Sequence, residues 1–346
     1  MEHLFYIGAK GRNDSAGIYR LVFDDVTNEL KTFSKDISGF SAEYLCFAKN
    51  INKLFSIGNE DTIRHTCEFS VFKTESHDGS LVKDYSIQLP FNGISHLLYS
   101  ASLNQVFISI YVSGQVAILD FTSSLHISSI RYLNFSGSGP NRFRQNASHP
   151  HSVCDDLHGS LFIPDLGADR IHWIRYNGSS EYQCCDIVCP EGSGPRHMCI
   201  LDNFAYIVCE LSSELLVYNL SSDMCVKGIP SFHIPLYQYN KETNLSADIR
   251  SYGNQIAISN RGEQNVMLFI INNGKPQITV TCKTGGKTRN LRYGSDGKYL
   301  FCVNEEYDNS DGSVNIINTH KGSSVFFRKI PGAHCIEFIG GIQFEG

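Results

Sequence analysis

Two short stretches near opposite ends of the chain, Leu4-Phe5-Tyr6-Ile7-Gly8 and Ala333-His334-Cys335-Ile336-Glu337-Phe338, decide the predicted fold. We call stretches like Leu4–Gly8 the first kind and stretches like Ala333–Phe338 the second kind. Elsewhere in the chain a stretch of the second kind comes directly before a stretch of the first kind, and the two are predicted to be neighbouring strands. The first stretch has no such strand before it, and the last has none after it. If these two stretches pair with each other, they complete one more sheet and leave no sheet edge unpaired.

The first kind of stretch is a short apolar strand that ends in polar residues, and the chain contains seven copies of it. The copies are about 44 to 55 residues apart, which is the length of a four-stranded propeller blade. A further run rich in β-branched and aromatic residues follows most copies, as expected for strands and not for helices. The copies begin at Leu4, Leu54, Val106, Leu161, Ala205, Ile256 and Leu300.

The repeat predicts an all-β fold, a seven-bladed β-propeller whose N- and C-terminal strands share one blade. Residues 1–346 are then one domain. Two ordinary β-sandwiches are the alternative, but they would not explain why each end of the chain supplies the strand that the other end lacks. A closed ring needs no partner to cover an edge, so we expect a monomer.

The composition limits the classes of function. Hydrophobic residues make up 42% of the 346 residues and charged residues 18%, so the chain can bury a large core and is not disordered. A net charge of -6 argues against a nucleic-acid partner. No apolar run approaches the ~20 residues of a membrane span, and the start lacks a signal-peptide pattern. The 12 cysteines are scattered, so we expect reduced thiols and a cytoplasmic protein.

Polar residues occupy equivalent positions near the start of each stretch of the second kind. In a propeller the innermost strands line the central channel, so these side chains are predicted to form a collar around one channel mouth. A solvated collar explains such charges as well as a binding site does. Inward arginines favour a site, because a guanidinium there needs a carboxylate partner or an anionic ligand. The collar positions are Glu43, Ser95, His151, Arg196, Asp248, Arg289 and His334.

Four pairs of segments carry a resemblance to a known family. They resemble the seven-bladed propeller lactonases, which include the cycloisomerase-2 type 6-phosphogluconolactonases and the carboxy-cis,cis-muconate cyclases. The resemblance spans nearly the whole chain and is strongest between His149 and Asn304. The segments are His149-Pro150-His151 with Pro164-Asp165-Leu166-Gly167, Gly194-Pro195-Arg196-His197 with Glu210-Leu211, Ala247-Asp248-Ile249-Arg250 with Ser259-Asn260-Arg261-Gly262, and Thr288-Arg289-Asn290 with Val303-Asn304-Glu305.

The chain also departs from the family pattern. Asp248 stands where the family usually has Glu, Cys209 precedes Glu210 where the family has Asn, and Glu305 replaces the usual Gln. The last change adds a negative charge to the expected pocket, so the substrate does not follow from the resemblance alone. Members of the family catalyse both lactone hydrolysis and ring closure.

The resemblance implies a lactonase acting on a small anionic lactone, for which the chain supplies suitable groups. Arg196, Arg261 and Arg289 would hold the anion, Glu210 would be the general base, and His151 would donate a proton to the oxyanion or the leaving alkoxide. The catalytic group would thus be His151, Glu210, Arg196 and Arg261. The substrate-binding residues would be His149, Arg289, Asp248, Asn260, Asn304 and Glu305.

Several of these residues also have simpler structural interpretations. His149 could only position His151, Asp248 could anchor an arginine, and Asn260 and Asn304 could cap loops. The same constellation could close a muconate into a lactone, and a propeller without the reaction could bind protein partners on its faces. No metal-ligand cluster, phosphate-binding glycine loop or Gly-x-Ser-x-Gly elbow is present, so we expect neither a metal nor another cofactor.

Overall fold

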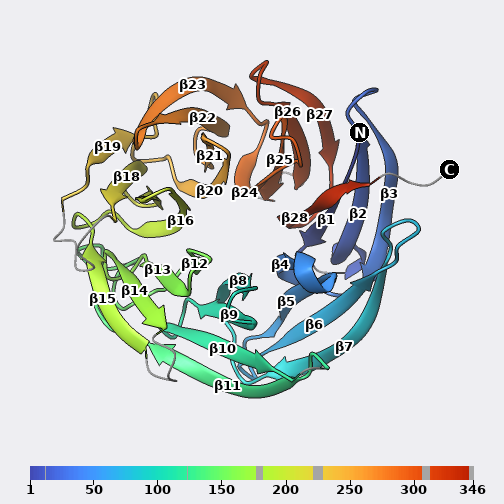
Figure 1. The fold of residues 1–346 in the computed structure, drawn as a ribbon, viewed down its shortest axis with the longest axis horizontal. Helices are drawn as coiled ribbons and strands as arrows, with labels where there is room; N and C mark the ends of the chain where they lie inside the picture. The colour runs from blue at the N-terminus through green and yellow to red at the C-terminus, as the bar shows by residue number, and fades with distance from the viewer. Residues whose placement is uncertain (12, 123, 177–181, 221–228, 306–311, 343–346) are drawn as a thin grey trace. The chain divides into compact units, whose positions relative to one another are not determined.

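The computed structural model describes residues 1–346 except 12, 123, 177–181, 221–228, 306–311 and 343–346. Within these described residues the regular structure is strands, apart from two short 3-10 turns at Asn13–Ser15 and Lys49–Ile51. The strands form seven four-stranded sheets, the blades of the predicted seven-bladed propeller (Figure 1). No described helix has the length and apolar character that a membrane crossing requires.

The chain divides into two compact units, which we describe separately. Unit 1 comprises residues 1–92, 255–269 and 278–346, and unit 2 comprises residues 93–254 and 270–277. That residues 1–346 act as one domain stays a prediction.

Three sheets lie within unit 1, and each is antiparallel. The first sheet has the order β28-β1-β2-β3, with β28 (Ala333–Ile342), β1 (Glu2–Ala9), β2 (Gly17–Asp24) and β3 (Glu29–Ser38). The second contains β4 (Ala42–Ala48), β5 (Lys53–Asp61), β6 (Thr66–Thr74) and β7 (Leu81–Leu89). The third contains β24 (Lys287–Tyr293), β25 (Tyr299–Glu305), β26 (Ser313–Asn318) and β27 (Ser323–Lys329). Their strands are short, and inner ones such as β1, β2 and β25 are nearly continuous apolar runs that are buried on both faces.

Unit 2 holds three further sheets of the same kind. The first contains β8 (Ile94–Ser100), β9 (Gln105–Ile110), β10 (Gln115–Phe121) and β11 (Ile127–Asn134). The second contains β12 (Cys154–Asp155), β13 (Ser160–Asp165), β14 (Arg170–Tyr176) and β15 (Tyr182–Val188). The third contains β16 (Pro195–Leu201), β17 (Phe204–Cys209), β18 (Glu214–Asn219) and β19 (Phe232–Pro235). The remaining sheet consists of β20 (Ser246–Tyr252), β21 (Gln255–Asn260), β22 (Asn265–Asn272) and β23 (Lys275–Lys283).

The two ends of the chain share one sheet, as predicted. Strand β1 pairs with both β2 and β28, and in Figure 1 the red β28 lies beside the blue β1. Phe5 pairs with Phe338, and Ile7 pairs with Ile336. Side chains pack closely against Gly8, where an added Cβ would lie 2.5 Å from the sulfur of Cys335. The predicted strand exchange between the chain ends is therefore confirmed.

An aromatic core in unit 1 joins this sheet to the sheet β24–β27. The rings of Phe5 and Phe301 lie 4.4 Å apart between centroids, and Phe23 meets Phe301 edge-to-face at 6.0 Å. All three side chains are fully buried. Burying each such side chain contributes about 1.5–3 kcal/mol. The core therefore fixes the sheet that carries both chain ends.

Candidate functional site

In five of the sheets a β-bulge lies near the start of one strand. These strands are β4, β8, β16, β24 and β28. In each case one residue has no opposite partner in the neighbouring strand, so the pairing register shifts by one. A bulge of this kind re-aims the side chain of the extra residue away from the regular alternation. The five extra residues are Glu43, Ser95, Arg196, Arg289 and His334, all members of the predicted collar.

In unit 2 the carboxylate of Glu210 lies between two arginines. Arg196 Nε donates to Glu210 Oε2 at 2.8 Å, and Arg144 Nη2 donates to Oε1 at 2.6 Å. Arg196 Nη1 also donates to the carbonyl of Ala247 at 2.6 Å. The structure thus brings together the predicted residues Arg196 and Glu210. Glu210 is the shared hydrogen-bond acceptor of the two guanidiniums.

Arg144 is the residue of this cluster that the sequence analysis missed. It lies in the connection between β11 and β12, where no strand pattern draws attention to it. The next residue, Gln145, is buried and donates to the carbonyl of Leu166 and to Asp169 Oδ1 at 2.9 and 2.7 Å. Gln145 therefore fixes the backbone from which Arg144 reaches Glu210. The available signal was an arginine shortly before the His149-Pro150-His151 motif.

The two arginines differ in their access to solvent. The side chain of Arg144 is 37% exposed, whereas that of Arg196 is 2% exposed. The pKa of Arg144 is raised, since the neighbouring Glu210 outweighs the opposing effect of burial. Arg144 is therefore a permanent cation on the open side of Glu210, and Arg196 is its buried counterpart.

Three histidines pack together beside this pair in unit 2. The ring of His197 lies 5.4 Å from those of both His96 and His151. His197 Nδ1 hydrogen-bonds to Asp248 Oδ1 at 2.9 Å. Burial and the nearby Arg196 lower the pKa of His197 to about 3, although Asp248 opposes this shift. His197 is therefore neutral at physiological pH and donates to the buried Asp248.

His151 and His149 lie on either side of Pro150 and have different environments. The ring of His149 stacks on Tyr111 at 4.4 Å, and its Nδ1 hydrogen-bonds to the carbonyl of Tyr111 at 2.7 Å. The ring of His151 meets the same tyrosine edge-on at 5.6 Å. His149 thus anchors the segment, as its simpler interpretation predicted, and His151 lies with the histidine cluster.

Asp248 also behaves as an anchor. Besides His197, its Oδ1 accepts from the backbone N–H of Ile249 at 3.0 Å and lies 3.3 Å from Arg250 Nη2. Its side chain is fully buried. The expected pairing of Asp248 with an arginine is therefore present, with Arg250 as the partner.

Unit 1 contains a second arginine–carboxylate cluster. Glu305 lies between Arg289, whose Nη1 is 3.2 Å from Oε2, and Arg261, whose Nη1 is 3.6 Å from Oε1. The three side chains are 13–20% exposed. The structure therefore joins three predicted site residues. The glutamate that replaces the usual glutamine of the family serves as the shared partner of both arginines.

Glu43 and His334 form a further ion-pair group in unit 1. His334 Nε2 is 3.0 Å from Glu43 Oε1, and the Lys10 ammonium contacts Oε2. The positive neighbours hold the pKa of Glu43 well below its usual range, even though burial acts in the opposite direction. A cavity of about 390 Å³ lies beside Glu43 and Lys10. The group is therefore a carboxylate held ionised beside an accessible space.

The two predicted asparagines are engaged by structural neighbours in unit 1. Asn304 accepts from the hydroxyl of Thr288 at 2.7 Å and donates to Ser313 Oγ at 2.9 Å. Asn260 donates to Asn265 Oδ1 at 2.9 Å. Both side chains are buried. These contacts match the capping role that was their simpler interpretation.

Among the described residues no group of three or more His, Cys, Asp or Glu side chains has an arrangement that could hold a metal ion. The side chains of the two arginine–glutamate clusters and of the histidines offer chemistry of their own. Guanidiniums can bind an anion, and carboxylates can accept a proton. The neutral imidazole of a histidine can take up a proton, and its imidazolium form can release one.

The comparison with known families gives one match over most of the chain. A family model described as "Lactonase, 7-bladed beta-propeller" matches residues 4–330. No curated protein matches the chain by sequence.

Solved structures with the same fold are numerous. The periplasmic gluconolactonase PpgL of Pseudomonas aeruginosa has a TM-score of 0.82 at 19% identity, with 98% of this chain and 99% of that chain covered. A 6-phosphogluconolactonase candidate from Bacteroides uniformis has a TM-score of 0.81 at 20% identity, covering 97% and 99%. A similar candidate from Bacteroides fragilis gives 0.79 at 20%, covering 97% and 98%. At these identities the similarity establishes the fold.

Proposed function

Because the chain belongs to the family of seven-bladed β-propeller lactonases, we propose that it hydrolyses a small anionic sugar lactone without a cofactor. The first substrate to test is 6-phosphogluconolactone. The family supports lactone hydrolysis as the class of reaction, and the solved structures of similar fold include proteins named for gluconolactone chemistry.

The observation that carries the proposal is the contact of Glu210 with two arginines of unequal exposure. Arg196 is buried and bound to the protein on two sides, so it holds Glu210 in place. Arg144 is exposed, and its contact with Glu210 Oε1 can be exchanged for a contact with a ligand. A phosphate or carboxylate is the ligand that a guanidinium binds best, by two parallel hydrogen bonds.

This arrangement suggests an order of events. The anionic group of the lactone binds Arg144 and draws it away from Glu210 Oε1. Glu210 then keeps its contact with Arg196, and its Oε1 accepts a proton from water. The hydroxide adds to the lactone carbonyl, and His151 donates a proton to the ring oxygen as the ring C–O bond breaks. The products are a hydroxy acid and an enzyme returned to its starting charge once the protons exchange.

The arginine–glutamate cluster of unit 1 is a second group whose cations can bind an anion. Arg261 and Arg289 both contact the carboxylate of Glu305. Such a cluster favours an anionic ligand over a neutral one. We assign substrate binding to Arg261, Arg289 and Glu305. We also assign it to His149, Asp248, Asn260 and Asn304, which would act indirectly by holding the backbone and neighbouring side chains in place.

The deciding experiment measures hydrolysis by purified protein of 6-phosphogluconolactone and of the unphosphorylated gluconolactone. We expect the phosphorylated lactone to be preferred and the Glu210→Gln variant to lose about a hundredfold or more in kcat. The exposed Glu242→Gln is the matched control and should keep full activity. Hydrolysis no faster than the buffer blank for both lactones would refute the proposal.

Ring closure of a carboxy-muconate uses the same groups and is the contrasting reaction. An acid protonates the alkene carbon while a substrate carboxylate attacks, which destroys the conjugated chromophore. Loss of muconate ultraviolet absorbance together with inactivity toward lactones would assign the chain to cyclisation. Inactivity in both assays would favour a propeller that only binds protein partners.

We also propose the cytoplasm as the compartment and a monomer as the working form. In support, the ten cysteines whose side chains are described are free thiols, which suits a reducing environment. PpgL is named as periplasmic, so the family is not confined to one compartment. Cell fractionation and light scattering of the purified protein test these two points.

A further inference from the structure

Tyr111 contacts several groups of the proposed site in unit 2, although the proposed reaction gives it no role. It follows β9, in the turn that leads to β10. Its ring lies flat against that of His149, with 4.4 Å between the centroids and 8° between the planes, and meets the ring of His151 edge-on at 5.6 Å. Its carbonyl accepts from His149 Nδ1 at 2.7 Å. These contacts hold the tyrosine in one place beside the predicted proton donor.

The hydroxyl of Tyr111 contacts the other part of the site. Burial opposes the charge of Arg144, yet the pKa of Arg144 is raised, because Glu210 and a hydrogen bond with Tyr111 stabilise the cation. A guanidinium carries only donors, so the phenol oxygen is the acceptor in this bond. The phenol keeps its own hydrogen, which can donate to a third group. Arg144 and Tyr111 thus present hydrogen-bond donors side by side.

The backbone that carries Arg144 is fixed as well. Asn141 Oδ1 accepts from the backbone N–H groups of Phe143 and Arg144 at 3.1 and 3.2 Å. The N–H of Gln145 donates to the carbonyl of Asn141 at 2.6 Å, and its carbonyl accepts from the N–H of Gly139 at 2.9 Å. A long arginine side chain loses much rotamer freedom when it binds a ligand. A fixed backbone and a partner at the guanidinium remove part of that cost before the ligand arrives.

The donors of Arg144 and Tyr111 suit an anion with several oxygens. A phosphate can accept two parallel hydrogen bonds from a guanidinium and another from a neighbouring hydroxyl. Glu210 repels an anion, but Arg144 and Arg196 both contact its carboxylate and offset its charge. An uncharged sugar hydroxyl gains much less from the same donors, because charge-assisted hydrogen bonds are about twice as strong as neutral ones.

We propose that Tyr111 is a specificity-determining residue of this site, and that it binds the phosphate of the substrate together with Arg144. The guanidinium supplies the charge and two of the hydrogen bonds, and the Tyr111 hydroxyl donates a further one. The preference for a phosphorylated over a neutral lactone then depends on the hydroxyl and not on the ring. This role rests on the proposed function for the identity of the substrate, whereas phosphate binding can be measured without the reaction.

Tyr111→Phe removes the hydroxyl and keeps the ring that packs on His149 and His151. We expect KM for 6-phosphogluconolactone to rise about tenfold, while kcat and the KM for gluconolactone are unchanged, since one charge-assisted hydrogen bond is lost. A fall in kcat for both lactones at unchanged KM would instead make Tyr111 a positioning residue for His151 and overturn its role in specificity. The matched control is Tyr132→Phe, on β11 at the edge of the sheet β8–β11, which should behave as the parent does.

Binding without the reaction is measured by isothermal titration calorimetry with glucose 6-phosphate, which carries the phosphate but no lactone. Glucose is the neutral comparison and should bind at least about tenfold more weakly. Tyr111→Phe and Arg144→Gln should each weaken the binding of glucose 6-phosphate about tenfold or more, while the circular dichroism spectrum is unchanged.

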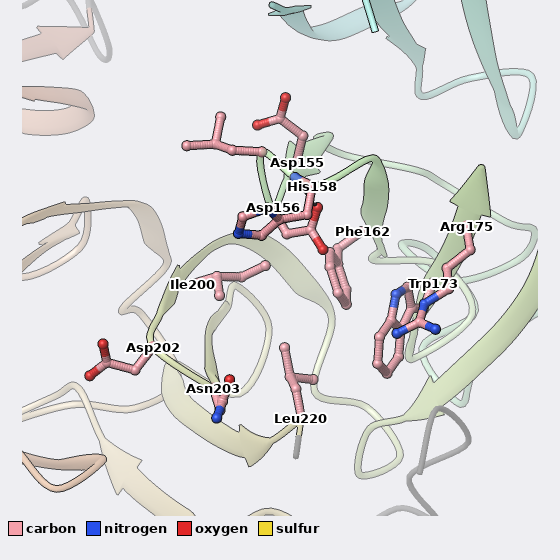
Figure 2. Close-up of a pocket in the computed structure, with 11 residues that line it drawn as sticks. Asp155, Asp156, His158, Phe162, Trp173, Arg175, Ile200, Asp202, Asn203 and Leu220 are labelled. Atoms are coloured by element: carbon pink, nitrogen blue, oxygen red, sulfur yellow. Dashed lines mark hydrogen bonds between the residues drawn. The ribbon is translucent and has the colours of Figure 1, made fainter. Parts of the chain in front are cut away.

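A control arginine lines a separate cavity of unit 2. This cavity, of about 460 Å³, is lined by Trp173, Arg175 and Asp202 among others (Figure 2). Ile200 also lines it and lies four residues after Arg196 on β16, which is roughly 13 Å along the strand. Arg175→Gln should therefore bind glucose 6-phosphate as the parent does.

The proposal fails if Tyr111→Phe binds glucose 6-phosphate as tightly as the parent does, or if it weakens glucose and glucose 6-phosphate equally. No binding of glucose 6-phosphate up to about 10 mM would also overturn it. Weakening by Arg175→Gln alone would place the phosphate in the cavity of Figure 2 instead. If the parent hydrolyses neither lactone but binds glucose 6-phosphate through the Tyr111 hydroxyl, the proposed reaction is wrong and the phosphate site stands.

Discussion

The stability of the protein should fall steeply between pH 6.5 and pH 4.5, and His197 should account for a large part of the slope. The pKa of this buried histidine is lowered to about 3, mainly by burial and then by Arg196. In the unfolded chain a histidine titrates near pH 6.5. Between these two values the unfolded state binds a proton that the folded state does not, so acid favours unfolding.

The magnitude follows from this difference in bound protons. One proton contributes about 1.4 kcal/mol per pH unit, and at pH 6.5 the unfolded histidine binds only about half a proton. From pH 6.5 to 4.5 His197 therefore contributes about 2 kcal/mol to the loss of stability. In the His197→Asn variant the amide can still donate to Asp248, but the side chain does not titrate. The variant should be less stable than the parent at pH 7, by about 1–3 kcal/mol for the imperfect packing and hydrogen bond. Its stability should then fall less as the pH is lowered.

The assay is urea unfolding at pH 7.0, 6.0, 5.0 and 4.5, with the free energy extrapolated to water at each pH. Other titrating groups, including the buried His3 and His334, whose pKa values are also lowered, are common to both proteins and cancel in the difference. The exposed His320→Asn serves as the control and should run parallel to the parent. If the His197→Asn curve also runs parallel to the parent, the histidine is not held neutral by burial and our account of the cluster is wrong.

Three further predictions concern the fold. Gly8→Ala places a methyl against the sulfur of Cys335 and should lower the urea midpoint by the equivalent of about 1–3 kcal/mol; an unchanged midpoint would mean that β1 and β28 are not closely packed. Phe301→Ala should cost about 3–5 kcal/mol in the same measurement, whereas a cost below about 1 kcal/mol would contradict the aromatic core. Asp165 accepts from the backbone N–H groups of His149 and Ala168 and from the His172 ring, so Asp165→Ala should cost about 3–5 kcal/mol and lower the melting temperature. A parent-like melting curve would refute that role.

The strand repeat could be predicted because it is written in local sequence. Each copy is a short apolar run, rich in β-branched or aromatic residues, with polar residues at its end, and this pattern is visible within a few neighbouring residues. The pairing of the two chain ends could be predicted as well. Each end lacks a neighbouring strand that the other end can supply, and their pairing leaves no sheet edge unpaired. The bulges at Glu43, Ser95, Arg196, Arg289 and His334 could not, since a bulge depends on the register against the partner strand.

For the site, the sequence supplied Arg196, Glu210 and the histidines as chemically suitable groups. It could not show that Arg144 joins them, because the contact of Arg144 with Glu210 spans 66 residues and leaves no periodic signal. The cavity beside Trp173 was missed for the same reason. Its lining residues come from strand ends and turns, and in the sequence their polar side chains cannot be told apart from those of ordinary surface loops.

The sequence by itself therefore determined the strands, their number per repeat and the pairing of β1 with β28, since these depend on short apolar runs and on unsatisfied backbone edges. Only the tertiary structure decided which charged side chains share a partner. Arg144 and Arg196 meet on Glu210, and Arg261 and Arg289 meet on Glu305. Charge pairing depends on distances of a few ångströms between segments far apart in the chain, and backbone periodicity does not encode such distances.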